Sequence, residues 1–374
     1  MRRVSGALGV ILWIGCAVGC GTEMGDETDA GPGPVDAGTS ETDAGTDAGS
    51  ESDAGVDGGA APFCGDGVVD EDEECDGALP EGVSCESEGW ASGDQATCTD
   101  CRVDTSRCEL ARQVSAGGLH SCSLGPDGVA TCWGRDANGE SAVPTGESFL
   151  SVDGGNGWTC GVRMDRTLLC WGWNELGMAS PPEGEFVQVS ASPMGAHACA
   201  IAVGGAIQCW GHNALGQANA PFRDTDLFTQ VASGRSHTCA IHVDGRAVCW
   251  GENDRRQASP PAGEFVQVGA GNDYSCGLRP DGALECWGHD AQGKSTPPPG
   301  AFIRLAVGGD HACAILTDGT LSCWGWDADD RTTPPAGLFR EVSCGLGHCC
   351  ALAADDSIAC WGNDVHGQAT APAP

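Results

Sequence analysis

The 374-residue chain has very little positive charge. Its 18 Lys and Arg, among which Lys294 is the single lysine, stand against 53 Asp and Glu and give a formal net charge of −35. Such a chain cannot neutralise the phosphates of a nucleic acid, and it has no basic patch with which to dock on anionic lipid. The composition therefore excludes nucleic acid as a partner, and any membrane contact has to come from another feature.

Long apolar runs are scarce as well. After Met1-Arg2-Arg3, the run of residues 4–19 is too short to span a bilayer comfortably and suits an export signal. It ends Ala-Val-Gly-Cys20, which resembles a bacterial lipobox, so we predict a signal peptide over 1–19 and lipidation of Cys20. Gly21 follows, and the resemblance then implies the outer membrane or cell surface, with the membrane reached only through the N-terminal lipid. An ordinary secretory signal is the alternative.

Residues 20–62 lack basic and large apolar side chains almost entirely. Residues 21–62 hold eleven acidic residues, and Asp-Ala-Gly occurs five times. Such a segment has little apolar surface to bury and repels itself, so we predict a disordered tether.

Cysteine, by contrast, is abundant, with 24 residues in the chain, which indicates an exported protein rich in disulfides. Residues 63–109 contain six cysteines, and their opening, Cys64-Gly-Asp-Gly-Val-Val-Asp-Glu-Asp-Glu-Glu-Cys75-Asp-Gly, resembles the Myxococcus cysteine-rich repeat. We predict three disulfides among Cys64, Cys75, Cys85, Cys98, Cys101 and Cys108, with the pairing left open. Calcium binding by the carboxylates between residues 66 and 76 is the alternative.

The rest of the chain, 110–374, is periodic. Cys-Trp-Gly recurs seven times at steps of 37 to 40 residues, and a second Cys precedes each by ten. Apolar residues alternate with a period of two between Gly- and Pro-rich turns, and no segment has a convincing helical period. The pattern predicts an all-β domain of short strands.

The fixed spacing also predicts the disulfides. Asp-Gly lies midway between the two cysteines of the first unit and suits a hairpin tip, which places the cysteines opposite each other on neighbouring strands. We predict Cys122–Cys132, Cys160–Cys170, Cys199–Cys209, Cys239–Cys249, Cys276–Cys286, Cys313–Cys323 and Cys350–Cys360, and an extra bridge Cys344–Cys349 in the last unit.

The repeat resembles the regulator of chromosome condensation repeat family. The match rests on segments such as Gly234-Arg-Ser-His237 and Trp210-Gly-His-Asn213-Ala-Leu-Gly216-Gln217. The resemblance implies a seven-bladed β-propeller. The units are short, like those of the bacterial β-lactamase inhibitor propeller of this group, and leave room for about three strands in each blade.

Within the repeat, the seven Trp of Cys-Trp-Gly are expected to pack between blades. Two residues before the first Cys stand five His, one Trp and one Tyr, which favours a packed ring with one hydrogen bond over a metal site. The residue after each Trp-Gly varies and is often aromatic or charged. It forms our candidate ligand face: Arg135, Trp173, His212, Glu252, His289, Trp326 and Asn363. Plain surface drift would produce the same variation.

No nucleophile with a base, paired carboxylates or metal-ligand set stands apart from the repeat. We therefore expect no catalytic residue, no cofactor and no metal, and a monomer that recognises a protein or glycan with one propeller face. An inhibitor of a secreted enzyme is the alternative, and an enzyme using the propeller channel ranks third.

Overall fold

The computed structural model describes residues 112–222 and 226–372 together with four short strands upstream, β1 (Ser92–Gly93), β2 (Thr97–Thr99), β3 (Arg102–Asp104) and β4 (Cys108–Glu109). β1 pairs with β4 and β2 with β3, both antiparallel. The predicted signal peptide, Cys20, the tether and the cysteine pairing of residues 63–109 lie outside the described residues. In the described part, no helix is both long and apolar enough to cross a membrane.

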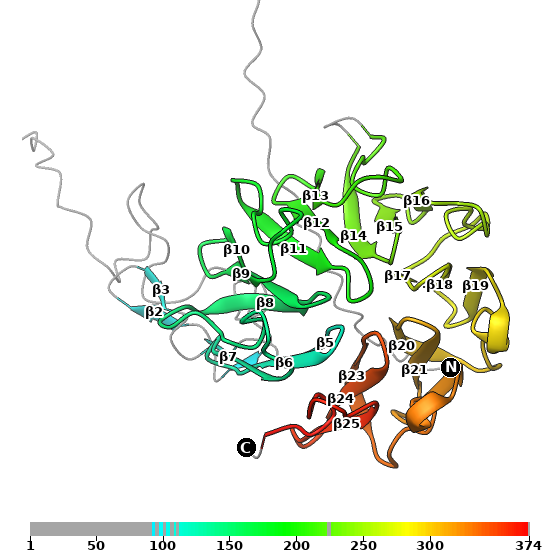
Figure 1. The fold of residues 1–374 in the computed structure, drawn as a ribbon. Helices are drawn as coiled ribbons and strands as arrows, with labels where there is room; N and C mark the ends of the chain where they lie inside the picture. The colour runs from blue at the N-terminus through cyan, green and yellow to red at the C-terminus, as the bar shows by residue number, and fades with distance from the viewer. Residues whose placement is uncertain are drawn as a thin grey trace, which may run out of the picture. The chain divides into compact units, whose positions relative to one another are not determined.

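Residues 113–362 form seven antiparallel sheets of three strands each, arranged in a ring (Figure 1). This confirms the predicted seven-bladed β-propeller with three-stranded blades. Blades one to four comprise β5 (Gln113–Ala116), β6 (His120–Leu124), β7 (Ala130–Gly134); β8 (Phe149–Gly154), β9 (Trp158–Arg163), β10 (Leu168–Gly172); β11 (Phe186–Ala191), β12 (His197–Ala202), β13 (Ile207–Gly211); and β14 (Phe228–Ser233), β15 (His237–His242), β16 (Ala247–Gly251). Blades five to seven comprise β17 (Gln267–Ala270), β18 (Tyr274–Leu278), β19 (Leu284–Gly288); β20 (Phe302–Val307), β21 (His311–Leu316), β22 (Leu321–Gly325); and β23 (Phe339–Cys344), β24 (His348–Ala353), β25 (Ile358–Gly362). Two 3-10 turns, η1 (Ala291–Gly293) and η2 (Ala328–Asp330), follow blades five and six.

The first strands of the seven blades together surround the central axis. Each first strand contacts the first strand of the next blade, and β23 contacts β5, which closes the ring. The second and third strands lie successively farther out because each sheet runs in sequence order.

A disulfide joins the second and third strands of every blade. Cys122 lies opposite Cys132 in the β6–β7 ladder, with a Cα–Cα distance of 4.0 Å, and the other six blades repeat this pairing. Gly128 at the hairpin tip has φ 76°, the left-handed conformation that glycine adopts without strain. An eighth bridge, Cys344–Cys349, joins the first two strands of blade seven.

The repeat tryptophans lie between blades, as expected. Each indole Nε1 donates a hydrogen bond of 2.7 to 3.1 Å to one backbone carbonyl of the preceding blade's closing loop. The acceptors, from blade one to blade seven, are Gln368, Glu140, Met178, Gln217, Gln257, Lys294 and Arg331.

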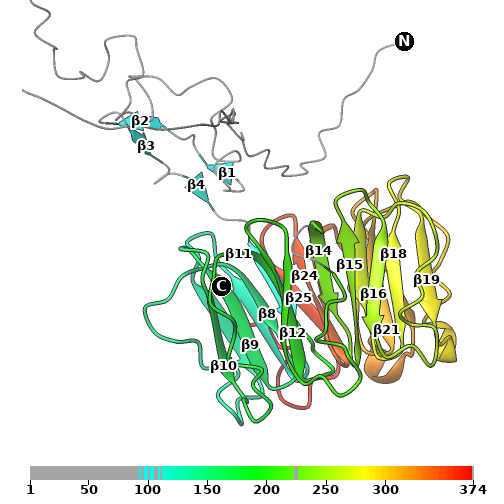
Figure 2. The ribbon, with the colours of Figure 1, turned by 90° about the horizontal axis from the view of Figure 1, so that it is seen from above.

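The propeller has two distinct ends, seen from the side in Figure 2. At the end that we call the loop face, first strands turn into second strands and third strands finish. At the other end, the hairpin face, first strands begin and the hairpins between second and third strands turn. The chain enters the first blade on the hairpin face, at Arg112.

Candidate recognition surfaces

The structure gathers all seven predicted ligand-face residues on the loop face. The backbone N–H of each donates to a carbonyl in the loop between the first two strands of its own blade, as in Arg135 to Leu119 and Trp326 to Asp310, at 2.7 to 2.9 Å across the set. All seven side chains are half-buried or exposed. The set therefore forms a ring at one end of the propeller, with one residue in each blade.

Five positions after each of these residues, the closing loop of the blade holds a buried residue. Several of these pairs are in direct contact. Arg135 faces Glu140 at 3.6 Å, His212 Nδ1 lies 2.9 Å from Gln217 Nε2, and Gln368 donates to Asn363 at 2.7 Å. Arg331 lies over the Trp326 ring at 4.7 Å. Variation at this position thus accompanies variation of the buried partner, a constraint that sequence reasoning missed.

The two tryptophans of the set differ. Trp326 is 45% exposed, whereas Trp173 is half-buried and packs against the apolar cluster that contains Met178, the residue five positions later. Trp326 is therefore the exposed aromatic ring of the predicted face, and Trp173 is largely a packing residue.

A charged cluster departs from the repeat in blades five and six. Lys294 replaces the glutamine of the Gly-Gln motif, is 2% exposed, and its Nζ contacts both Asp273 and Asp310, the latter at 2.6 Å. His289 Nδ1 lies 2.9 Å from Asp273, and Asn272 donates to Asp310 at 2.7 Å. The sequence signal was the single lysine at a glutamine position, with an Asp at one loop position of two consecutive blades.

The predicted packed rings bond to the next blade. His Nε2 lies 2.7 to 2.9 Å from a Ser or Thr hydroxyl in the pairs His120–Thr159, His197–Thr238, His237–Ser275 and His348–Ser121. These hydroxyls donate to backbone carbonyls, so Nε2 is the donor to them. In blades two and five the histidine is replaced by Trp158 and Tyr274. The next blade there has Ala198 and Ala312 in place of the Ser or Thr, so in these two blades the histidine is absent where its hydroxyl partner is absent.

Burial keeps these histidines neutral. It lowers the pKa of His120 and His237 to about 4 and that of His197, His311 and His348 to about 3. His311 differs in its partner, since its Nε2 lies 3.1 Å from Cys349 Sγ. The sulfurs of Cys344 and Cys349 lie near this ring but are joined in a disulfide, so the group His311, Cys344 and Cys349 does not offer a set of metal ligands.

The hairpin face carries most of the exposed apolar surface in the described part of the chain. Of the thirteen large apolar residues that are exposed there, nine lie on this face: Val129, Met164, Val187, Val203, Leu227, Val243, Val266, Ile303 and Leu338. Val187 and Ile303 stand at β-bulges, where the ladder shifts register. Sequence periodicity did not reveal this surface, because a bulge turns Val187 and Ile303 outward against the alternation and the other seven residues lie just outside the strands.

Comparison with known proteins agrees with the architecture. Residues 228–257, 302–330 and 339–368 match the regulator of chromosome condensation (RCC1) repeat. The ectodomain of the receptor kinase CR4 from Physcomitrella patens is similar at 26% identity and a TM-score of 0.57, over 67% of this chain and 73% of that one. The CRINKLY WD40 ectodomain of the Arabidopsis thaliana receptor kinase ACR4 is similar at 24% identity and a TM-score of 0.57, over 68% and 97%.

Prp20p from Saccharomyces cerevisiae, whose structure is described with its binding to Gsp1p and histones, has 16% identity and a TM-score of 0.55, over 63% of this chain and 80% of that one. No curated protein matches the sequence. The domain is an RCC1-like β-propeller.

Proposed function

We propose that this RCC1-like propeller is a non-catalytic recognition module that binds a protein through the loop face of blades five and six. The observation that carries the proposal is the contact of Trp326 with the charged cluster: its backbone N–H donates to the carbonyl of Asp310 at 2.8 Å, and the carboxylate of Asp310 pairs with Lys294. An exposed aromatic residue is thus joined through its backbone to charged groups that are already fixed in place.

Such an arrangement suits protein recognition energetically. Binding energy in protein interfaces is concentrated in Trp, Tyr and Arg side chains, and Trp326 is stacked with Arg331. Lys294 holds two carboxylates in fixed positions, so little side-chain entropy remains to be lost on binding. Prp20p, a structural neighbour, is described with protein partners, which supports the same class of ligand.

We further propose that the protein is exported and held at the cell surface by a lipid on Cys20, with residues 20–62 as a tether. The eight disulfides in the described residues support an oxidising compartment. Replacement of Cys20 by Ser should move the protein from the membrane fraction to the soluble fraction, and identical fractionation of variant and parent would reject the anchor.

The recognition role is tested by partner capture from cell-surface and culture extracts, with the full mature chain carrying Cys20→Ser as bait. Trp326→Ala should lose at least about tenfold in affinity for the captured protein, as expected for an anchor side chain. Leu215→Ala is the matched control, because Leu215 is an exposed apolar residue on the loop face of blade three. Equal loss in both variants, or in neither, would reject the proposed site.

A further inference from the structure

Six of the seven blades hold a phenylalanine near the start of the first strand. These rings, which are at most 6% exposed, are Phe149, Phe186, Phe228, Phe265, Phe302 and Phe339. Each backbone N–H donates to a hairpin carbonyl of the preceding blade at 2.8 to 2.9 Å. Phe149 shows the environment: it packs between Leu124 and Ala130 of blade one and Trp171 of blade two.

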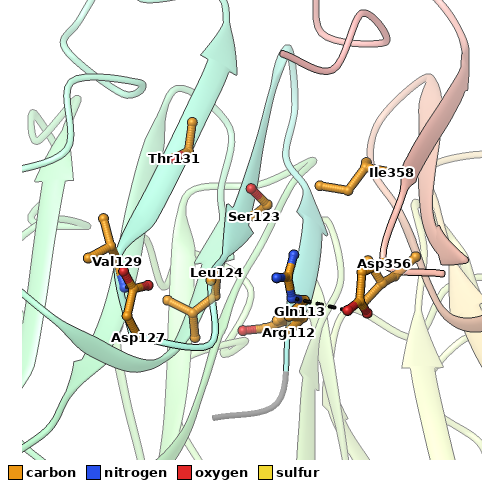
Figure 3. Close-up of a pocket in the computed structure, with 11 residues that line it drawn as sticks. Arg112, Gln113, Ser123, Leu124, Asp127, Val129, Thr131, Asp356 and Ile358 are labelled. Carbon is orange, nitrogen blue, oxygen red and sulfur yellow. Dashed lines mark hydrogen bonds and ion pairs between the residues drawn. The ribbon is translucent and has the colours of Figure 1, made fainter. Parts of the chain in front are cut away.

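Blade one lacks this ring. Counting back from Val114, the counterpart of Val152, places Ala111 in register with Phe149, and Ala111 lies outside the described residues. At the corresponding place between blades seven and one is a pocket of about 220 Å³ (Figure 3). Leu352 and Ile358, the counterparts of Leu124 and Ala130, line one side of it.

The opposite side is formed by Ser123 of β6 and Thr131 of β7. The residues equivalent to Ser123 in the other six blades are Gly or Ala, and all six are buried: Gly161, Ala200, Ala240, Gly277, Ala314 and Ala351. Gly161 is required by its ring, since a Cβ there would lie 2.3 Å from the Phe149 ring. Ser123 is only half-buried, which shows that its pocket is open where the other six are filled.

The blade-one side of the pocket carries two hydroxyls. Those of Ser123 and Thr131 have no hydrogen-bond partner among the described residues, and Ser123 stands where the other six blades have Gly or Ala. Arg112, Asp127 and Asp356 are the charged residues that line the pocket, and Asp356 pairs with Arg112 and also with Arg340, which does not line it. With Arg340 counted, two positive and two negative charges balance, so an uncharged ligand suits the site better than a charged one.

We infer that this pocket binds a tyrosine side chain of a partner protein. The aromatic ring would take the place that phenylalanine fills in the other six blades, between Leu352 and Ile358 on one side and the β6–β7 sheet on the other. The phenol is uncharged and both donates and accepts hydrogen bonds, which matches the two free hydroxyls. The surrounding hairpin face is rich in exposed apolar side chains. The pocket lies at the opposite end of the propeller from Trp326, so the tyrosine site and the Trp326 site can be tested independently.

The test uses N-acetyl-L-tyrosine amide as the probe and the full mature chain carrying Cys20→Ser, with binding measured by ligand-observed NMR. We expect millimolar binding, at least about fivefold tighter than that of N-acetyl-L-phenylalanine amide, because the phenylalanine probe leaves the hydroxyls unpaired. Ser123→Leu should abolish binding by filling the pocket from one side. Ile358→Phe should do so from the other side, in case the first variant does not fold.

The double variant Ser123→Ala/Thr131→Leu supplies residues found in other blades and should remove the preference for tyrosine over phenylalanine. Trp326→Ala is the control and should bind the probe as the parent does. Absence of binding, binding that survives both filling variants, or equal affinity for the two probes in the parent would overturn the proposal.

Discussion

The indole Nε1 of Trp133 donates a hydrogen bond of 3.0 Å to the backbone carbonyl of Gln368, 235 residues farther along the chain. The same carbonyl accepts from Ser121 Oγ at 2.8 Å, and Ser343 Oγ accepts from the N–H of Ala116. Blade seven thus meets blade one through the contacts that join other neighbouring blades. In the described part, every disulfide lies within one blade, so ring closure there depends on these non-covalent contacts.

Truncation of the chain just before Gln368 tests this closure. A chain ending at Gly367 loses four hydrogen bonds of Gln368, two at its carbonyl and two at its side chain, and should lose roughly 4 kcal/mol of unfolding free energy at about 1 kcal/mol per hydrogen bond. A chain ending at Thr370 keeps Gln368 and is the control. Urea unfolding of both chains measures the difference, and equal midpoints would show that Gln368 does not close the ring.

Much of the fold could be predicted because its determinants are local. The ten-residue spacing of the cysteines is the spacing of facing residues in a hairpin, and Cys199 and Cys209 do face each other. Contacts between blades could not be predicted in the same way, because the partner of a residue is set by the next repeat. The partner of His311 is Cys349, and the exposure of Trp326 but not Trp173 follows from Arg331 and Met178 five residues later.

The pair His311–Cys349 gives a second prediction. Cys349 occupies the position of the hydroxyl that receives the histidine in four other blades. The double variant Cys344→Ala/Cys349→Ser should therefore retain a partner for His311 and lose only the contribution of the short disulfide loop. Cys344→Ala/Cys349→Ala should be less stable than it by about 1–3 kcal/mol, because it leaves a buried N–H unpaired. Thermal unfolding compares the two, and equal stability would contradict the bonding role of this position.

Glu341 gives a pH-dependent prediction. Gln188, in the same register of blade three, donates to the carbonyl and accepts from the N–H of Val231, both at 3.0 Å. Glu341 accepts from the N–H of Val114, and burial raises its pKa to about 7 from 4.5. Between these values the folded state binds more protons than the unfolded one, so the parent gains stability as the pH falls from 8 to about 4.5.

Glu341→Gln restores the amide pair and removes the titration. It should stabilise the propeller by about 1–3 kcal/mol at pH 8 and by much less at pH 5. The reverse change, Gln188→Glu, is the matched control and should destabilise most at pH 8. Urea midpoints at the two pH values decide, and a pH-independent gain for Glu341→Gln would mean that the carboxyl titrates normally.

Trp173 and Trp326 occupy the same repeat position, so their replacement separates packing from recognition. Trp173 packs against the cluster around Met178, and Trp173→Ala should cost about 2–4 kcal/mol of unfolding free energy through the cavity it leaves. Trp326 is 45% exposed, and Trp326→Ala should cost less than about 1 kcal/mol of stability while removing an anchor for the bound protein. Unfolding midpoints and partner capture are measured on the same preparations, so a loss of binding cannot be confused with a loss of fold. If Trp326→Ala unfolds as readily as Trp173→Ala and still captures the partner, the ring of Trp326 is a packing residue and the loop face of blade six does not bind the protein.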